Sequence, residues 1–90
     1  MKLDIRREDG RFVASTEAGE ATLEYSKKDS GTIEYESTFV PEEARGRGIG
    51  ERLVTHALDW ASEQGYRVVP TCSFVQHVLE EKPEYRRLTG

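Results

Sequence analysis

The hydrophobic period of this chain changes at Pro41, and this change limits the possible folds more than any other feature of the sequence. Before Pro41, apolar and polar residues alternate in short runs, a pattern typical of half-buried β-strands. After Pro41, apolar residues recur at every third or fourth position, a pattern typical of an amphipathic helix. We therefore expect the 90 residues to form an α+β fold, in which helices are layered on a sheet.

Three alternating runs precede Pro41, and the links between them are short. The predicted strands are Phe12–Glu17, Ala21–Lys28 and Thr32–Val40. In the third strand, Ile33, Tyr35 and Phe39 are expected on one face, because side chains alternate along a strand. Each link contains a glycine, as tight turns between antiparallel strands often do, so the three strands are expected to form a meander.

The residues after Pro41 predict a long helix that covers the sheet. Its apolar stripe runs for about four turns and consists of Ile49, Leu53, Val54, Ala57, Leu58 and Ala61. Gly65 follows directly, in the position where a glycine commonly ends a helix.

One more strand and a second, shorter helix are expected next. Tyr66–Thr71 is predicted to be a strand in which Pro70 interrupts the hydrogen bonding to a neighbour. Ser73–Gln76 fits a capping box and predicts the start of the second helix. Pro83 is expected to close that helix, leaving Tyr85–Gly90 as a tail.

Charge and cysteine content exclude several classes of function. The net charge of -4 disfavours nucleic-acid binding, because affinity for phosphate backbones comes from clustered Lys and Arg. The lone cysteine, Cys72, allows no intramolecular disulfide and no multi-cysteine metal site, which favours a reducing compartment. The charged N-terminal residues and the lack of a long apolar run predict neither a signal peptide nor a membrane-spanning segment. We expect one domain over residues 1–90, monomeric or weakly dimeric, in the cytoplasm, without metal, membrane or nucleic-acid partners.

A glycine-rich loop stands between the meander and the long helix, with the sequence Arg45-Gly46-Arg47-Gly48-Ile49-Gly50. The first amides of a helix have no internal partner and lie at the positive end of its dipole, so they stabilise an anion. Glycines let the backbone approach phosphate oxygens, and the two arginines add charge-assisted donors. The loop lacks the Lys-Ser/Thr pair of nucleotide-hydrolysing loops and follows an antiparallel strand, which disfavours nucleotide hydrolysis and dinucleotide redox chemistry. A merely flexible turn is the alternative.

The loop also carries a resemblance to a known family. Arg45, Gly48 and Gly50 form the pattern Arg-x-x-Gly-x-Gly, which resembles the coenzyme A signature of the GNAT acetyltransferase superfamily. The similarity extends to the short GNAT-like group that includes the bacterial YjdJ-type proteins. It spans roughly residues 10 to 86 and is carried by Ser37–Gly50, Val69–Val75 and Lys82–Tyr85.

The resemblance implies a fold, a cofactor and a set of binding residues. The strand ending at Val40 and the strand beginning near Tyr66 would splay apart, and the pantetheine arm of acetyl-CoA would enter the gap. Backbone groups of Phe39 and Val40 would bond the pantetheine amides. The backbone of Gly46–Gly50 would donate to the diphosphate, beside the side chains of Arg45 and Arg47. The implied activity is transfer of an acetyl group from acetyl-CoA to an amine on a small molecule or a protein.

The candidates for catalysis are Cys72 and Tyr85. The short group commonly has His-Thr-Glu where this chain has Ser37-Thr38-Phe39, and a histidine at the position of Lys82, so those general bases are absent. Cys72 precedes the second helix, where a thiolate is stabilised, and the resemblance places it at the reactive end of coenzyme A. It either accepts the acetyl group during transfer or only lines the thioester pocket. By the resemblance, Tyr85 would take the place of the tyrosine that GNAT enzymes often have after the last strand, where it protonates the departing thiolate.

Four other titratable residues are expected at the surface: Glu34, Glu36, His56 and His77. If either glutamate were buried, a raised pKa would make it a substitute base. The alternative to an enzyme is a non-catalytic module that binds coenzyme A or an acyl-CoA, because the loop is preserved while the usual bases are missing. A third class is a protein-interaction domain without a ligand.

Overall fold

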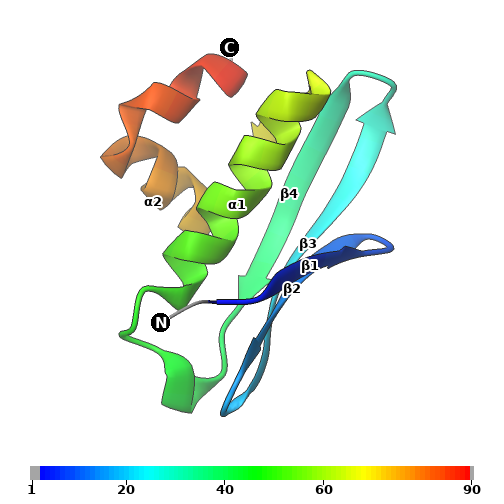
Figure 1. Cartoon of the computed structure of the whole chain (residues 1–90). Coiled ribbons are helices and arrows are strands. Elements are labelled where there is room, and N and C mark those ends of the chain that lie inside the picture. The colour runs from blue at the N-terminus through cyan, green and yellow to red at the C-terminus, as the bar shows by residue number, and fades with distance from the viewer. Residues whose placement is uncertain (1–2, 90) are drawn as a thin grey trace.

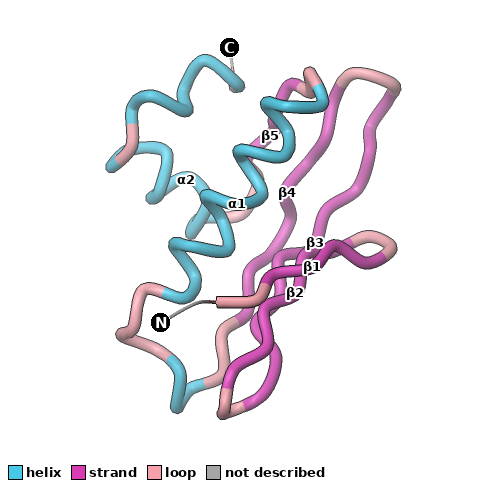
Figure 2. Tube along the Cα trace, in the orientation of Figure 1, coloured by secondary structure: helices cyan, strands magenta, loops and turns pink. Residues whose placement is uncertain are grey.

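Five strands form one sheet with two helices packed against it, in a computed structural model that describes residues 3–89. The strands lie in the order in which they occur in the chain, and they are β1 Ile5–Glu8, β2 Arg11–Thr16, β3 Gly19–Asp29, β4 Thr32–Phe39 and β5 Arg67–Pro70. The helices are α1 Ile49–Gln64 and α2 Ser73–Glu81, with short 3-10 helices η1 Glu42–Ala44 and η2 Pro83–Leu88. Both α-helices lie on one side of the sheet and share one buried core with it (Figures 1 and 2).

The first four strands are antiparallel, and α1 connects β4 to a parallel β5. The predicted α+β class, with a meander and a later strand, is therefore confirmed. β1 was not predicted, because its four residues are mostly exposed and show no apolar alternation. Its pairing with β2 across the turn at Gly10, where φ is 82°, makes it a strand.

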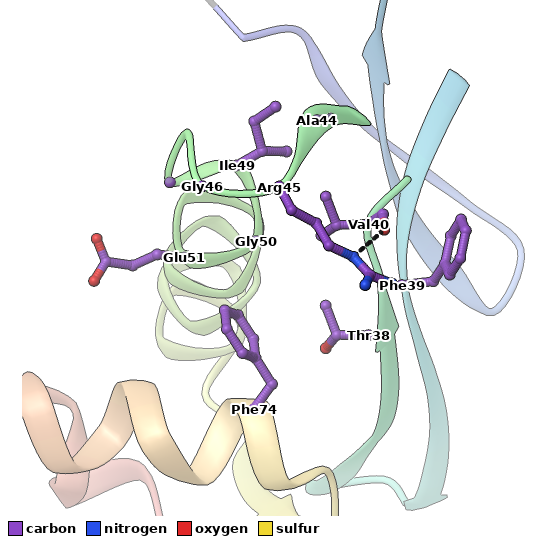
Figure 3. A pocket seen from close by; sticks show the side chains of 11 residues that line it. Thr38, Phe39, Val40, Ala44, Arg45, Gly46, Ile49, Gly50, Glu51 and Phe74 are labelled. Atoms are coloured by element: carbon purple, nitrogen blue, oxygen red, sulfur yellow. Dashed lines mark hydrogen bonds between the residues drawn. The ribbon is translucent and has the colours of Figure 1, made fainter. Parts of the chain in front are cut away.

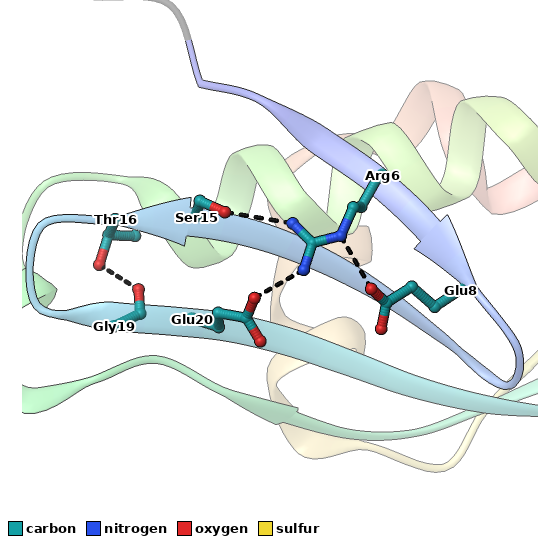
Figure 4. A network of polar contacts seen from close by, with 6 residues as sticks. All are labelled: Arg6, Glu8, Ser15, Thr16, Gly19 and Glu20. Atoms are coloured by element: carbon teal, nitrogen blue, oxygen red, sulfur yellow. Dashed lines mark hydrogen bonds and ion pairs between the residues drawn. The ribbon is translucent and has the colours of Figure 1, made fainter.

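Side chains on the uncovered face tie β1 to the meander (Figure 4). The guanidinium of Arg6 donates to Glu8 at 2.8 Å, to Ser15 at 3.1 Å and to Glu20 at 2.6 Å, and so joins three strands. Because these pairs are exposed to solvent, they add little to the stability of the fold. Backbone pairing with β2 holds β1 on the sheet, and the hydrogen bonds of Arg6 add to that attachment.

A bulge in β4 decides which side chains face the helices. Ser37 pairs with Glu24, whereas Tyr35 pairs with the next residue of β3, so Glu36 is an extra residue on β4. An extra residue reverses the face to which the following side chains point. Tyr35 is therefore fully buried, but Phe39 is 55% exposed. The prediction that Phe39 shares a face with Tyr35 is wrong, because strict alternation fails at the bulge.

The long helix forms as predicted. All six residues of its apolar stripe are buried, and Gly65 ends it with φ 77° and an amide that donates to Ser62 O at 3.1 Å. The buried hydroxyl of Tyr35 donates to Ala57 O at 2.5 Å and so attaches β4 to the middle of α1. Desolvation raises the pKa of Tyr35, which keeps this hydroxyl protonated as a donor.

The start of α2 differs from the prediction. Cys72, rather than Ser73, is the N-cap residue. The side-chain amide of Gln76 donates to Pro70 O at 2.8 Å instead of reaching back to the cap. The predicted capping box is therefore wrong, because Ser73 is already the first residue of the helix and not the residue before it.

The expected tail is ordered structure over its described residues. η2 begins at Pro83, and Leu88 is buried in the core beside α1 and α2. A single apolar residue in a short, charged segment gave no periodic signal, which explains why the element was not predicted. Gly90, the last residue of the predicted tail, lies outside the described residues.

The sheet opens between β4 and β5. Their pairing ends where Tyr35 lies opposite Pro70, and the Cys72 amide then donates to Tyr35 O at 3.1 Å before the chain turns into α2. Over the described residues, the second half of β4, Ser37–Phe39, has no β5 partner. The predicted splay is confirmed. Among the described helices, none combines the length and the apolar character needed to cross a lipid bilayer.

Candidate functional site

A groove of about 430 Å³ lies between the free end of β4 and the first turn of α1 (Figure 3). This volume falls within the range of small-molecule sites. The groove brings the loop together with the end of the strand, as predicted, and its lining residues are Thr38, Phe39, Val40, Ala44, Arg45, Gly46, Gly48, Ile49, Gly50, Glu51 and Phe74. Thr38 and Val40 point toward the groove, whereas the Phe39 ring points away from it (Figure 3).

The loop at one end of the groove presents free backbone amides. Gly46 and Gly48 have φ of 83° and 76°, in the left-handed region that favours glycine, and this turns the chain into α1. Within residues 3–89, the amides of Ile49, Gly50 and Glu51 donate to no other group of the chain. A Cβ at Gly46 or Gly48 would meet no atom within 4 Å. The loop therefore has both the donors and the open space that a diphosphate requires.

Gly50 has a different role from the other two glycines. Its φ is not in the left-handed region, but a Cβ there would lie 3.0 Å from two atoms of the Phe74 ring and 3.3 Å from Val40 Cγ2. The missing side chain thus lets α2 and the end of β4 approach α1 closely. Gly46 and Gly48 are needed for their backbone conformation, whereas Gly50 is needed because Phe74 and Val40 lie so close to it.

The two loop arginines lie on different sides of the loop. Arg45 lines the groove, and its Nε donates to Val40 O at 3.1 Å (Figure 3). Arg47 lines a second hollow of about 210 Å³, together with Glu17 and Glu43 near the turn between β2 and β3. The structure therefore places Arg45, but not Arg47, against the groove.

Cys72 lies behind the groove, where β5 ends and α2 begins. Its Sγ is 3.4 Å from the hydroxyl of Thr38, which lines the groove. Desolvation opposes ionisation of the thiol, but hydrogen bonds from Thr38 and from the amides of Val75 and Phe74 outweigh it, so the pKa of Cys72 is lowered. A lowered pKa increases the thiolate fraction near neutral pH. The structure thus joins the predicted thiol to the predicted groove through Thr38.

Tyr85 lies apart from the groove. Its hydroxyl donates to Asp59 Oδ1 of α1 at 2.7 Å, and this bond, with burial, raises the pKa of Tyr85 to about 12. The groove lies at the first turn of α1, whereas Asp59 is in the helix's second half. Protonation of a leaving thiolate by Tyr85 stays a prediction from the resemblance.

The two glutamates of β4, Glu34 and Glu36, have different surroundings. Glu34 is half-buried, but a hydrogen bond from the Thr71 hydroxyl and an ion pair with Lys28 at 3.0 Å lower its pKa. The raised pKa that a substitute base needs is therefore not found at Glu34. Glu36 is exposed and accepts a hydrogen bond from Ser26 at 2.8 Å.

The predicted surface histidines are exposed. His56 packs edge-on against Phe12, with 5.8 Å between ring centroids, and His77 pairs with Glu81 at 3.4 Å. Over residues 3–89, no group of three or more His, Cys, Asp or Glu side chains is placed to hold a metal ion.

Four residues that line the groove were not predicted as site residues, namely Thr38, Ala44, Glu51 and Phe74. Thr38 reaches the groove because the β4 bulge reverses the alternation, and nothing in the sequence marked the bulge. Phe74, 36% exposed, stands at the start of α2 and closes one side of the groove. A large apolar residue directly after a predicted N-cap was a signal that could have identified it.

Comparison with protein families gives a match over nearly the whole chain. The model of the GCN5-related N-acetyltransferase family matches residues 11–88. The chain is also similar to Protein NATD1 of Xenopus tropicalis, at 33% identity over 63 residues, which is 70% of this chain and 58% of that protein. Protein NATD1 of Bos taurus is 35% identical over 63 residues, 70% of this chain and 56% of that protein. The chain thus matches little more than half the length of these relatives.

A solved structure has the same fold. The NMR structure of a GCN5-like protein from Staphylococcus aureus superposes with a TM-score of 0.77 at 26% identity, covering 96% of this chain and 86% of that one. The family match, the shared fold and the open groove agree with the resemblance carried by Arg45, Gly48 and Gly50. This chain belongs to the GCN5-related N-acetyltransferase family.

Proposed function

We propose that this chain transfers an acetyl group from acetyl-CoA to an amine acceptor. The observation that carries the proposal is the groove, which has free amides at the start of α1 and a path through Thr38 to the Cys72 thiol. The family model supports an acyltransferase of this kind. Acetyl-CoA supplies an activated acetyl thioester, and the chain supplies binding and orientation.

The binding residues follow from the parts of the groove. The amides around Gly46, Gly48 and Gly50 hold the diphosphate of coenzyme A, with the Arg45 guanidinium beside it. The free end of β4 offers backbone groups of Phe39 and Val40 to the amides of the pantetheine arm. The thioester then lies toward Thr38 and Cys72.

We propose Cys72 as the acetyl carrier. Its thiolate attacks the thioester carbonyl, a new sulfur–carbon bond forms on Cys72 and the bond to the coenzyme sulfur breaks. The proton that Cys72 gives up when it ionises ends on the departing coenzyme thiolate, so that coenzyme A leaves as the free thiol. The acceptor amine then attacks the acetyl-Cys72 carbonyl, and its proton returns to the released Cys72 thiolate. The lowered pKa of Cys72 and its place at the N-terminus of α2 support this route.

Intact-mass measurement tests the carrier role. Incubation with acetyl-CoA, without an amine, is expected to add one acetyl group to the wild-type chain and none to Cys72→Ala. Direct attack of the amine on the thioester, with Cys72 only lining the pocket, predicts no added mass and full activity in Cys72→Ala.

A non-catalytic coenzyme A module is the second candidate. It is favoured by the groove lining, in which Arg45 and Glu51 are the titratable side chains and neither is an evident base. In Figure 3 the Glu51 carboxylate points away from the groove. Measurement of thiol release across a broad panel of small and protein-borne amines separates the two functions. Stabilisation by coenzyme A without thiol release would favour the binding module, and no stabilisation would favour a protein-interaction domain.

A further inference from the structure

The Arg45 guanidinium bonds the backbone carbonyl of Val40, a residue that lines the groove. Its Nε donates to Val40 O at 3.1 Å, and both residues line the groove. Val40 directly follows the last residue of β4. Its carbonyl therefore lies at the free end of the strand, where an entering ligand meets the chain. The side chain extends from the loop toward the end of β4 to make this bond (Figure 3).

This bond competes with any ligand that uses the same carbonyl in the same direction. Apart from Thr38, Arg45 and Glu51, the lining side chains are apolar, so backbone groups are the main partners for an amide in the groove. Pantetheine without a diphosphate is neutral. To bond Val40 O it must displace the charged guanidinium of Arg45, which then loses its acceptor. A ligand that also carries a diphosphate offers the guanidinium a stronger, charge-assisted partner.

We propose that Arg45 determines specificity for diphosphate-bearing thioesters by occupying Val40 O until a diphosphate takes the guanidinium. The inference rests on the proposed function, because it concerns the same groove. It adds a selection rule: pantetheine thioesters that lack a diphosphate are disfavoured donors, although they carry the same reactive end. Arg45 is thus both a binding residue for the diphosphate and a competitor of the pantetheine arm.

Removing Arg45 tests the rule by moving two affinities in opposite directions. In Arg45→Ala, coenzyme A is expected to bind about tenfold more weakly, because a charge-assisted contact is lost. Pantetheine is expected to bind about three- to tenfold more tightly, because its competitor is absent. Arg47→Ala is the matched control: it removes the same charge from the same loop, but Arg47 lines the other hollow. It is expected to leave the affinity for pantetheine unchanged.

A second measurement uses the unaltered protein. Saturating inorganic pyrophosphate should draw the guanidinium away from Val40 O and so lower the Kd of pantetheine about three- to tenfold. This cooperativity should vanish in Arg45→Ala. Both affinities are measured by NMR titration, and the Arg45 Nε–H resonance should shift when pyrophosphate binds.

The outcomes separate the inference from the proposed function. If coenzyme A fails to bind the wild-type chain, the proposed function itself is wrong. If coenzyme A binds but pantetheine affinity falls, stays the same or remains undetectable in Arg45→Ala, the competition is refuted and the groove assignment stands. Pyrophosphate that binds without changing the Kd of pantetheine refutes the competition as well.

Discussion

The ionisation of Cys72 depends on two neighbours that come from distant parts of the chain. Thr38 on β4 contacts the thiol at 3.4 Å, and the first amides of α2 donate to it. Burial raises the pKa of the Cys72 thiol, but these hydrogen bonds lower it by more, so the net shift is downward. The cysteine was visible in the sequence, but its environment was not, because the contact with Thr38 depends on the β4 bulge.

Thr38→Val should make Cys72 less reactive at neutral pH. The substitution keeps the shape and removes the hydroxyl, so the pKa of the thiol rises and its rate of alkylation by iodoacetamide should reach half-maximum at higher pH. Ser37→Ala is the control, since Ser37 faces Glu24 on the uncovered side. An unshifted profile in Thr38→Val would show that Thr38 does not set this pKa.

Tyr85→Phe should destabilise the fold by about 1 kcal/mol at pH 7, the usual net value of one hydrogen bond. The pKa of Tyr85, about 12 when folded, lies above the unfolded value of about 10. Its stabilisation is therefore complete below about pH 10 and declines as pH rises toward 12. Urea unfolding of both proteins at pH 7 and pH 11 measures this difference. A fall in transfer rate with equal stability would instead support the proton-donor role.

At the scale of elements, the loop between β4 and α1 combines two kinds of glycine. Gly48 is required by its backbone conformation, with φ 76°, whereas Gly50 is required by the nearness of Phe74 and Val40. Substitution by alanine should therefore have different effects at the two positions, although the sequence motif treats them alike.

Gly48→Ala should lower the free energy of unfolding by about 1–2 kcal/mol, because alanine is strained at positive φ. Gly50→Ala should change it by less than about 1 kcal/mol, because the gain in helix propensity offsets the shift of the Phe74 ring. The displaced ring should narrow the groove and weaken coenzyme A binding. Urea unfolding and calorimetric titration measure the two effects. Equal loss of stability in both variants would contradict the distinction.

Elements with strong periodicity were predictable, and short or irregular ones were not. The stripe of α1 and the glycine that ends it determined that helix correctly, because both signals are local. β1 has no apolar alternation, and its existence depends on pairing with β2. The bulge at Glu36 depends on the register between β3 and β4. η2 depends on one buried side chain, Leu88.

At the scale of the whole molecule, the site lies where the sheet opens. β5 pairs with the first half of β4 only, and α1 begins beside the unpaired half. The sequence located this site because the loop directly follows the predicted strand, and because Pro70 is a separate local signal for interrupted pairing. It did not locate Phe74 or Thr38, which reach the groove through tertiary packing. Tyr85 packs on the second half of α1, away from it.

Coenzyme A should raise the free energy of unfolding, and more so as its concentration exceeds its Kd. A ligand at a hundred times its Kd adds about 2.7 kcal/mol to the free energy of unfolding. Thermal melts at increasing coenzyme A concentration should therefore show a rising Tm. Adenosine offers no diphosphate to the loop amides and should leave the Tm nearly unchanged. A Tm that adenosine raises as much as coenzyme A does would mean that the loop is not the binding element.

The most direct test follows the backbone amides during a titration with coenzyme A. In an NMR experiment on isotope-labelled protein, the largest amide shifts should occur at Gly46–Glu51 and at Phe39 and Val40, with small changes on β1 and η2. Coenzyme A that binds without moving the resonances of Gly46–Glu51, or that does not bind at millimolar concentration, would contradict the assignment of the groove as the coenzyme site.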